Sequence, residues 1–132
     1  MPAVMTFAHL TLPTRDVHRT ALFFETTLGY TRRSVPANSP VDAQWLELGH
    51  GQQMHVVRVE DFEASRFEGE FGRHVAVRYP LAGFDALKAR LRDQGAEVFN
   101  AVRAVPFERF FFRDPVNGFV FEVLPDEIAA PE

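Results

Sequence analysis

Residues 9–29 (HLTLPTRDVHRTALFFETTLG) and residues 74–95 (HVAVRYPLAGFDALKARLRDQG) decide the fold, because the second stretch repeats the pattern of the first. Each stretch opens with a histidine on a short alternating segment that favours a β-strand, and each continues into apolar residues at helical spacing. Asp16 is placed to cap the start of the first helix, and Gly29 is placed to end it. Gly95 stands in the second stretch where Gly29 stands in the first. The repeat therefore predicts two strand–helix units of the same design.

Further strands follow each of these units. Residues 45–57 and residues 110–123 each consist of two β-favouring segments around a glycine-containing turn, which predicts two hairpins. Residues 30–35 and 97–102 lie between helix and hairpin, and each can supply one more strand. Each half of the chain is thus predicted to be a βαβββ module, and the fold class is α+β.

Length and composition exclude several classes of protein. The chain has 132 residues, which fits one domain at 1–132 with modules at about 5–59 and 73–125. The absence of cysteine excludes disulfides, thiolate nucleophiles and zinc–thiolate sites. A net charge of −4 without a basic block gives binding to nucleic acid or to an anionic membrane surface little electrostatic support. No apolar run is long enough to span a membrane and residues 1–9 do not resemble a signal peptide, so we expect a cytoplasmic protein.

Four potential metal ligands occupy matching positions in the two modules. His9 and His74 open the first strands, and His55 and Glu122 lie in the last strands, after the hairpin turns. Side chains alternate between the two faces of a strand, and the purely apolar set of each strand suits packing against a helix. The four polar groups then share the opposite face, which converges if the sheet curves. Because a carboxylate on a mostly apolar strand is costly to bury unless it is paired or coordinated, we expect a metal site built from at least three of the four.

Each of these residues also has a purely structural explanation. A strand histidine such as His9 or His74 is usually just half-buried, and His55 could lie on the surface of its hairpin. Glu122 could pair with an arginine. The matched positions favour the metal site over these explanations. The other candidates fit structural roles better: Arg109 and Arg113 as partners of Glu122, His18 on an exposed helical face, His50 in a tight turn, Lys88 on a solvated helix, and the phenylalanines at 107 and 110–112 in the core.

The sequence resembles the vicinal oxygen chelate superfamily over about residues 5–125. The resemblance rests on the two βαβββ modules, on the histidine that opens each, and on the run Phe-x-x-Arg-Asp-Pro-x-Asn-Gly-x-x-x-Glu at residues 110–122. This superfamily includes glyoxalase I, fosfomycin- and bleomycin-resistance proteins, methylmalonyl-CoA epimerase and extradiol dioxygenases. The resemblance implies a single glyoxalase-like domain, in which a partly open, eight-stranded, barrel-like curved sheet carries the helices on its outer face. It also implies a homodimer, whose metal site can lie within one chain or combine ligands from two.

The resemblance further implies a divalent metal ion that chelates two adjacent oxygen atoms of a small-molecule substrate. His9, His74 and Glu122 match ligands used across the superfamily. His55 matches the fourth position, where glyoxalase I-like enzymes usually carry glutamate and the epimerases glutamine, and it is either a ligand or a base. The nitrogen-rich set suits zinc, iron, nickel or cobalt better than magnesium.

The function most favoured by this resemblance is a metal-dependent, glyoxalase-like lyase or isomerase that works through an enediolate-type intermediate. Glu122 or His55 would move the proton. A non-haem iron dioxygenase of the extradiol type is one alternative, because two histidines and one carboxylate are the usual ligands of such enzymes. A bleomycin-resistance-like protein that sequesters a ligand is another, although those proteins lack the metal ligands that this chain retains. Fosfomycin transfer is less favoured, because the further basic and hydroxyl residues it requires have no match.

Overall fold

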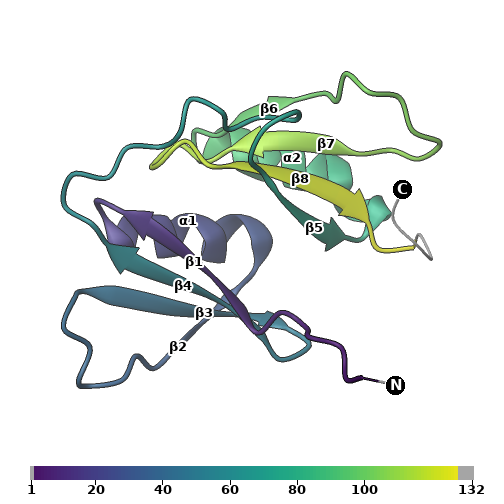
Figure 1. Ribbon diagram of the computed structural model, residues 1–132. Helices are drawn as coiled ribbons and strands as arrows, with labels where there is room; N and C mark the ends of the chain where they lie inside the picture. The colour runs from purple at the N-terminus through teal and green to yellow at the C-terminus, as the bar shows by residue number, and fades with distance from the viewer. Residues whose placement is uncertain (1, 128–132) are drawn as a thin grey trace. The chain divides into compact units, whose positions relative to one another are not determined.

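The chain forms two compact units, each built from one βαβββ module (Figure 1). The computed structural model describes residues 2–127. The boundary falls between residues 63 and 64, and we call residues 2–63 the first unit and residues 64–127 the second unit. The predicted α+β class and the two modules are confirmed.

The first unit is a four-stranded mixed sheet with one helix on one face. Its elements are β1 (His9–Thr14), α1 (Val17–Leu28), β2 (Thr31–Arg33), β3 (Ala43–Gly49) and β4 (Gln52–Arg58). The strand order is β1-β4-β3-β2, in which β1 runs parallel to β4 and the other pairs are antiparallel. The parallel pairing of β1 with β4 brings the first and last strands of the module side by side.

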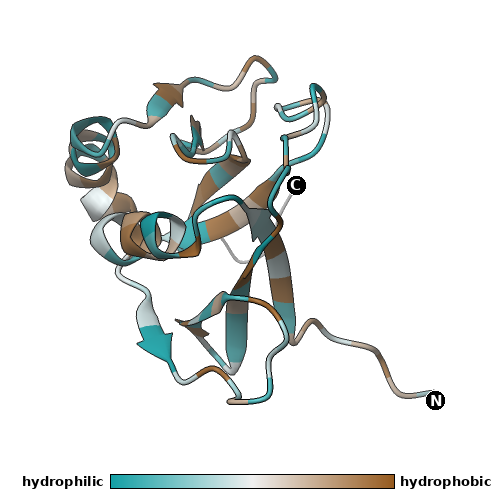
Figure 2. Cartoon of the chain, turned by 90° about the vertical axis from the view of Figure 1, so that its left-hand side faces the viewer, coloured by the Kyte–Doolittle hydropathy of each residue, from teal (hydrophilic) through white to brown (hydrophobic). Residues whose placement is uncertain are grey.

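Helix α1 begins and ends where the sequence predicts. The Asp16 carboxylate accepts a hydrogen bond from the Arg19 backbone N–H at 3.0 Å, and Gly29 follows the last turn with φ of 76°. The helix is amphipathic, and Figure 2 shows that both helices carry hydrophobic and hydrophilic residues. Its buried residues are Val17, Thr20, Ala21, Phe23, Phe24 and Thr27. The strand residues with no exposed surface are Leu12, Thr14, Leu46, Met54 and Val56, and they form the other half of this core.

The second unit repeats this design. Its elements are β5 (Val75–Tyr79), the 3-10 turn η1 (Leu81–Gly83), α2 (Phe84–Asp93), β6 (Glu97–Phe99), β7 (Phe110–Arg113) and β8 (Val120–Pro125). The strand order is β5-β8-β7-β6, with β5 parallel to β8. Phe84, Leu87 and Leu91 of α2 are buried, and the Phe84 and Phe110 rings meet edge to face at 5.2 Å. Neither helix within residues 2–127 is long and apolar enough to cross a membrane.

A turn centred on Asp114 fixes the register of β7 and β8. The buried Asp114 carboxylate accepts hydrogen bonds from the backbone N–H groups of Val116, Asn117 and Phe119 at 2.7–3.2 Å. Burial raises the pKa of the Asp114 carboxyl and outweighs the opposing effect of these hydrogen bonds. The resulting register places Glu122 opposite Phe111.

The strands differ from the predicted segments mainly at their ends. His74 lies one residue before β5 instead of on the strand. The strands predicted at 30–35 and 97–102 are only three residues long each, β2 and β6. Pairing sets these limits, because β2 and β6 are paired only over three residues of their neighbours β3 and β7.

Candidate functional site

The four predicted ligands form two separate pairs, one in each unit. His9 and His55 are neighbours in the first unit, and His74 and Glu122 are neighbours in the second. Within residues 2–127, neither unit gathers three or more histidine, aspartate and glutamate side chains in an arrangement that could hold a metal ion. Each pair is therefore described by itself.

In the second unit, a nitrogen of His74 faces an oxygen of Glu122. The His74 Nε2 atom lies 3.5 Å from Glu122 Oε1. On its other side, the His74 ring places Nδ1 3.1 Å from the carbonyl oxygen of Gly69. A carbonyl oxygen can only accept, so Nδ1 carries a hydrogen and donates it. This contact fixes the orientation of the ring.

The contact between His74 and Glu122 requires a positive charge. With its hydrogen on Nδ1, a neutral His74 points the Nε2 lone pair at a carboxylate oxygen, which is also an acceptor. A proton on Nε2 or a metal ion between the two atoms would satisfy both. Two ligands that bind one ion at about 2.1 Å in tetrahedral geometry are separated by about 3.4 Å. The observed 3.5 Å fits this separation.

Arg109 holds the second oxygen of Glu122. Arg109 Nη1 donates to Glu122 Oε2 at 2.5 Å, so the structural explanation of Glu122, an arginine partner, is confirmed. Arg113 has a different partner, Glu97, at 3.2 Å. Arg109 Nη2 lies 3.4 Å from Glu70 Oε2. Two carboxylates thus surround one guanidinium, and their formal charges leave this cluster at −1, which favours a further cation.

Glu70 is anchored by backbone groups as well as by Arg109. It accepts hydrogen bonds from the N–H groups of Val102 and Arg103 at 2.7 and 3.0 Å. Burial alone raises the pKa of the Glu70 carboxyl, but these two hydrogen bonds and the charge of Arg109 outweigh burial, and the pKa is lowered. Glu70 is therefore ionised at neutral pH.

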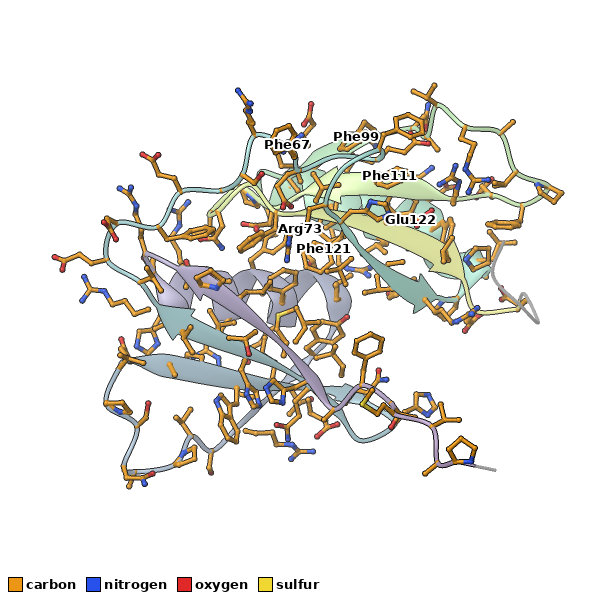
Figure 3. The ribbon with its side chains drawn as sticks, in the orientation of Figure 1. Phe67, Arg73, Phe99, Phe111, Phe121 and Glu122 are labelled. Atoms are coloured by element: carbon orange, nitrogen blue, oxygen red, sulfur yellow. The ribbon has the colours of Figure 1, made fainter. Side chains whose placement is uncertain are left out.

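Aromatic rings form the apolar side of this cluster. Phe111 is completely buried, and its ring meets the His74 ring edge to face at 5.4 Å. Phe99 stacks on Phe111 at 5.5 Å. Figure 3 labels Glu122 on β8 and Phe111 on the neighbouring strand β7. The rings limit the water around the His74–Glu122 pair on this side, which strengthens its electrostatic interactions.

In the first unit, His55 is the middle ring of a stack of three. Its ring centroid lies 3.9 Å from that of Trp45, on the opposite strand β3, and 3.9 Å from that of His9. His55 Nε2 donates to Gln53 Oε1 at 2.9 Å. The pKa of His55 is lowered, first by burial and then by the nearby His9.

This stack limits how His9 and His55 can bind metal. The two rings are within 19° of parallel, and an imidazole binds an ion close to its own ring plane. One ion cannot lie in two parallel planes, so binding by both residues requires one ring to rotate. His9 is the exposed member of the stack and the one free to do so.

His18, His50 and residues 110–112 lie where the structural explanations place them, but Phe107 is half-buried instead of part of the core. Lys88 is half-buried, with its Nζ 5.0 Å from the Phe110 ring centroid, instead of fully solvated. His18 and His50 are exposed, and His50 has φ of 53° in its turn. Phe110, Phe111 and Phe112 have no exposed surface. Glu70, Trp45 and Gln53 were not anticipated from the sequence. Glu70 is 39 residues from Arg109 in a segment without regular spacing, so no sequence signal could have paired them.

Solved structures share this architecture. A fosfomycin resistance protein, FosX, from Listeria monocytogenes matches with a TM-score of 0.74 and 19% identity, over 92% of this chain and 91% of that one. A structure described as a glyoxalase family protein, from Bacillus anthracis, matches with a TM-score of 0.75 and 18% identity, over 96% of this chain and 99% of that one. The fold is that of the vicinal oxygen chelate proteins.

A further solved structure with the vicinal oxygen chelate fold carries a metal ion. It is a variant of Listeria monocytogenes FosX complexed with Mn(II) and 1S,2S-dihydroxypropylphosphonic acid, with a TM-score of 0.75 and 18% identity over 92% of each chain. The sequence matches no protein-family model and no curated protein. At these identities the comparisons show the fold.

Proposed function

We propose that the chain is a metal-dependent enzyme that acts on a small molecule with two adjacent oxygen atoms. One observation carries this proposal. His74 Nε2 and Glu122 Oε1 face each other 3.5 Å apart beside a cluster with a charge of −1, an arrangement that calls for a proton or a metal ion between the two atoms. Such an arrangement is stabilised by a cation and is destabilised without one.

His74 and Glu122 are proposed as one pair of metal ligands, with His9 as a third. His55 is a fourth ligand or the group that moves the proton. Zinc, iron, nickel and cobalt suit this set, and the Mn(II) complex of the FosX variant adds manganese. A divalent ion held by these residues would supply Lewis-acid polarisation of the substrate oxygens.

The substrate class is proposed from the fold and from one neighbour. The phosphonate bound to the FosX variant carries two adjacent hydroxyl groups, which supports a substrate with vicinal oxygens here. Within this class we favour a lyase or isomerase of the glyoxalase type. In that reaction Arg109 keeps Glu122 oriented, and Glu122 or His55 accepts and returns the substrate proton. We further propose a homodimer in the cytoplasm, which sedimentation and cell fractionation would test.

The test of function is a panel of assays on metal-stripped and metal-reloaded protein. Thiohemiacetal isomerisation and solvent proton exchange test the favoured chemistry. Opening of fosfomycin tests the chemistry suggested by the FosX names, and oxygen uptake with catechols and ferrous iron tests the dioxygenase. We expect isomerisation or exchange that depends on added metal. Oxygen uptake alone would replace the lyase with the dioxygenase, and ligand binding without turnover by any loaded protein would replace it with the sequestering protein.

The two candidate proton carriers can be separated. If His55 is the base, His55→Gln lowers kcat while the protein keeps its metal. If His55 is a ligand, the same substitution lowers the metal content. Glu122→Gln is the corresponding variant for the carboxylate.

A further inference from the structure

Arg109 is an arginine with almost no exposed surface. Its side chain is only 4% exposed, although it carries a permanent charge. Besides Glu122 and Glu70, it contacts the carbonyl oxygen of Arg103, to which Nη2 donates at 2.6 Å. Its Nε atom is buried and has no hydrogen-bond partner within residues 2–127. Burying a charged group with an unpaired nitrogen is costly. The contacts of Nη1 and Nη2 with Glu122, Glu70 and the Arg103 carbonyl oxygen must therefore hold the Arg109 side chain in place.

Those contacts divide the two oxygens of Glu122 between different partners. Oε2 accepts from Arg109 Nη1 at 2.5 Å, and Oε1 faces His74 Nε2 at 3.5 Å. A carboxylate without the first contact could turn both oxygens toward an ion and bind it in bidentate fashion. With Oε2 engaged, only Oε1 is directed toward His74.

Arg109 is itself fixed in place. Glu70 accepts from Arg109 and is held by the backbone N–H groups of Val102 and Arg103. The guanidinium also lies 5.5 Å from the centroid of the Phe111 ring. Glu70 balances the charge of Arg109, so the guanidinium orients Glu122 without cancelling the negative charge that a metal ion needs.

We propose that Arg109 is a positioning residue of the metal site, which restricts Glu122 to coordination through Oε1 alone. This inference rests on the proposed function, because it assigns Glu122 as a ligand. It predicts that both the affinity for metal and the coordination geometry depend on a residue that does not touch the ion. Hydrogen-bonding partners of metal ligands typically contribute a factor of about 10 to 100 in affinity.

The test is a titration of the metal-free protein with cobalt(II), followed by calorimetry and by visible absorption. The absorption bands of cobalt(II) report coordination number. The variants are Arg109→Met, which removes the contact, and Arg109→Lys, which keeps a cation but lacks the planar fork that joins Glu122 to Glu70. Arg113→Met is the matched control, since Arg113 is the last residue of β7, Arg109 directly precedes the first residue of β7, and Arg113 pairs with Glu97 instead.

We expect Arg109→Met to bind cobalt(II) about 10 to 100 times more weakly than the wild type, with an altered visible spectrum. Arg109→Lys should be intermediate in affinity, and Arg113→Met should match the wild type in both readouts. If Arg109→Met does not fold, as judged by circular dichroism of the metal-free protein, the comparison of Arg109→Lys with wild type decides. Wild-type affinity and spectrum in Arg109→Lys would then overturn the proposal.

The outcomes distinguish this inference from the proposed function. If the wild type binds cobalt(II) and Arg109→Met binds it equally or more tightly with the same spectrum, the positioning role is wrong while the metal site stands. If the wild type does not bind cobalt(II), nickel(II), zinc(II), iron(II) or manganese(II), the proposed function is wrong, and the inference is overturned with it.

Discussion

His74 Nε2 and Glu122 Oε1 face each other 3.5 Å apart. His74 is oriented by its hydrogen bond to the Gly69 carbonyl, and Glu122 by its ion pair with Arg109. The two orienting contacts come from different segments of the chain, and they keep Nε2 and Oε1 facing each other, where we propose that a metal ion binds. Substitutions of residues around this arrangement, and of residues that shape the two units, should have measurable effects on stability and hydrogen exchange.

Glu70 anchors the segment that contains Val102 and Arg103, because its carboxylate accepts hydrogen bonds from both backbone N–H groups. Glu70→Gln removes the negative charge that these backbone N–H groups and Arg109 share. We expect amide hydrogen exchange at residues 102 and 103 to become about tenfold faster, corresponding to about 1.4 kcal/mol, close to the lower end of the range of about 1.5–3 kcal/mol for a hydrogen bond to a charged group. Glu127→Gln, at an exposed position, is the control. Unchanged protection at 102 and 103 would contradict this role.

The Glu70 carboxyl should also make hydrogen exchange at residues 102 and 103 depend on pH. The pKa of Glu70 is lowered in the folded state, so the folded state binds a proton less readily than the unfolded state does. Its stabilising contribution is therefore fully present above the ordinary value of 4.5 and is lost as the pH falls through the lowered folded-state pKa. Hydrogen exchange at residues 102 and 103 should accelerate only below about pH 4.5 in wild type. In Glu70→Gln the acceleration should be present already at neutral pH.

Tyr30 makes stability depend on pH in the opposite direction, because its contribution falls as the pH rises at high pH. Burial raises the pKa of its hydroxyl from 10.0 to about 12. Between these values the unfolded state has lost the proton and the folded state has kept it, so stability falls as the pH rises. Tyr30→Phe should remove an absorbance step of tyrosinate with a midpoint at about 12. It should also flatten the loss of stability between pH 10 and about 12. A step near 10 in the wild-type-minus-variant difference would show that Tyr30 is solvated.

Gly29 ends α1 with a left-handed backbone, at φ of 76°, and no side chain or backbone from elsewhere in residues 2–127 lies within 4 Å of the place that a Cβ would take. Gly29→Ala should therefore lower the free energy of unfolding by about 1–2 kcal/mol through backbone strain alone. Gly69→Ala is the matched control, because Gly69 also has open space but no positive φ. Urea unfolding measures both, and an equal effect of the two substitutions would contradict the explanation.

The ends of α1 were predictable because local side chains determine them. Asp16 caps the helix through a residue three positions away, and Gly29 ends it through its own backbone freedom. The pairing of strands is less local. His74 was predicted on a strand, but β5 begins one residue later because it pairs in parallel with β8, more than 40 residues away. Sequence alternation cannot fix that register.

The candidate site was predictable only in part. The alternation of side chains put His74 and Glu122 on one face, and the structure brings these two within 3.5 Å of each other. The structural alternative for Glu122, an arginine partner, is met by Arg109. It could not indicate Glu70, which reaches Arg109 from the segment between the modules. It also could not predict that His55 stacks between Trp45 and His9, because stacking depends on side-chain rotamers and on strand register. The full set of four ligands stays a prediction.

The most direct test of the account is the metal content of purified protein after reconstitution with a divalent metal and removal of excess ion. Wild type, His74→Ala, Glu122→Ala and the exposed-residue control His18→Ala would be compared by elemental analysis and equilibrium dialysis. We predict about one ion per chain in the wild type and in His18→Ala, and at least about a tenfold loss of affinity in the other two variants. Folded wild-type protein that retains no ion, or His74→Ala and Glu122→Ala variants that retain it as well as the wild type does, would contradict the central claim that these two residues share a metal.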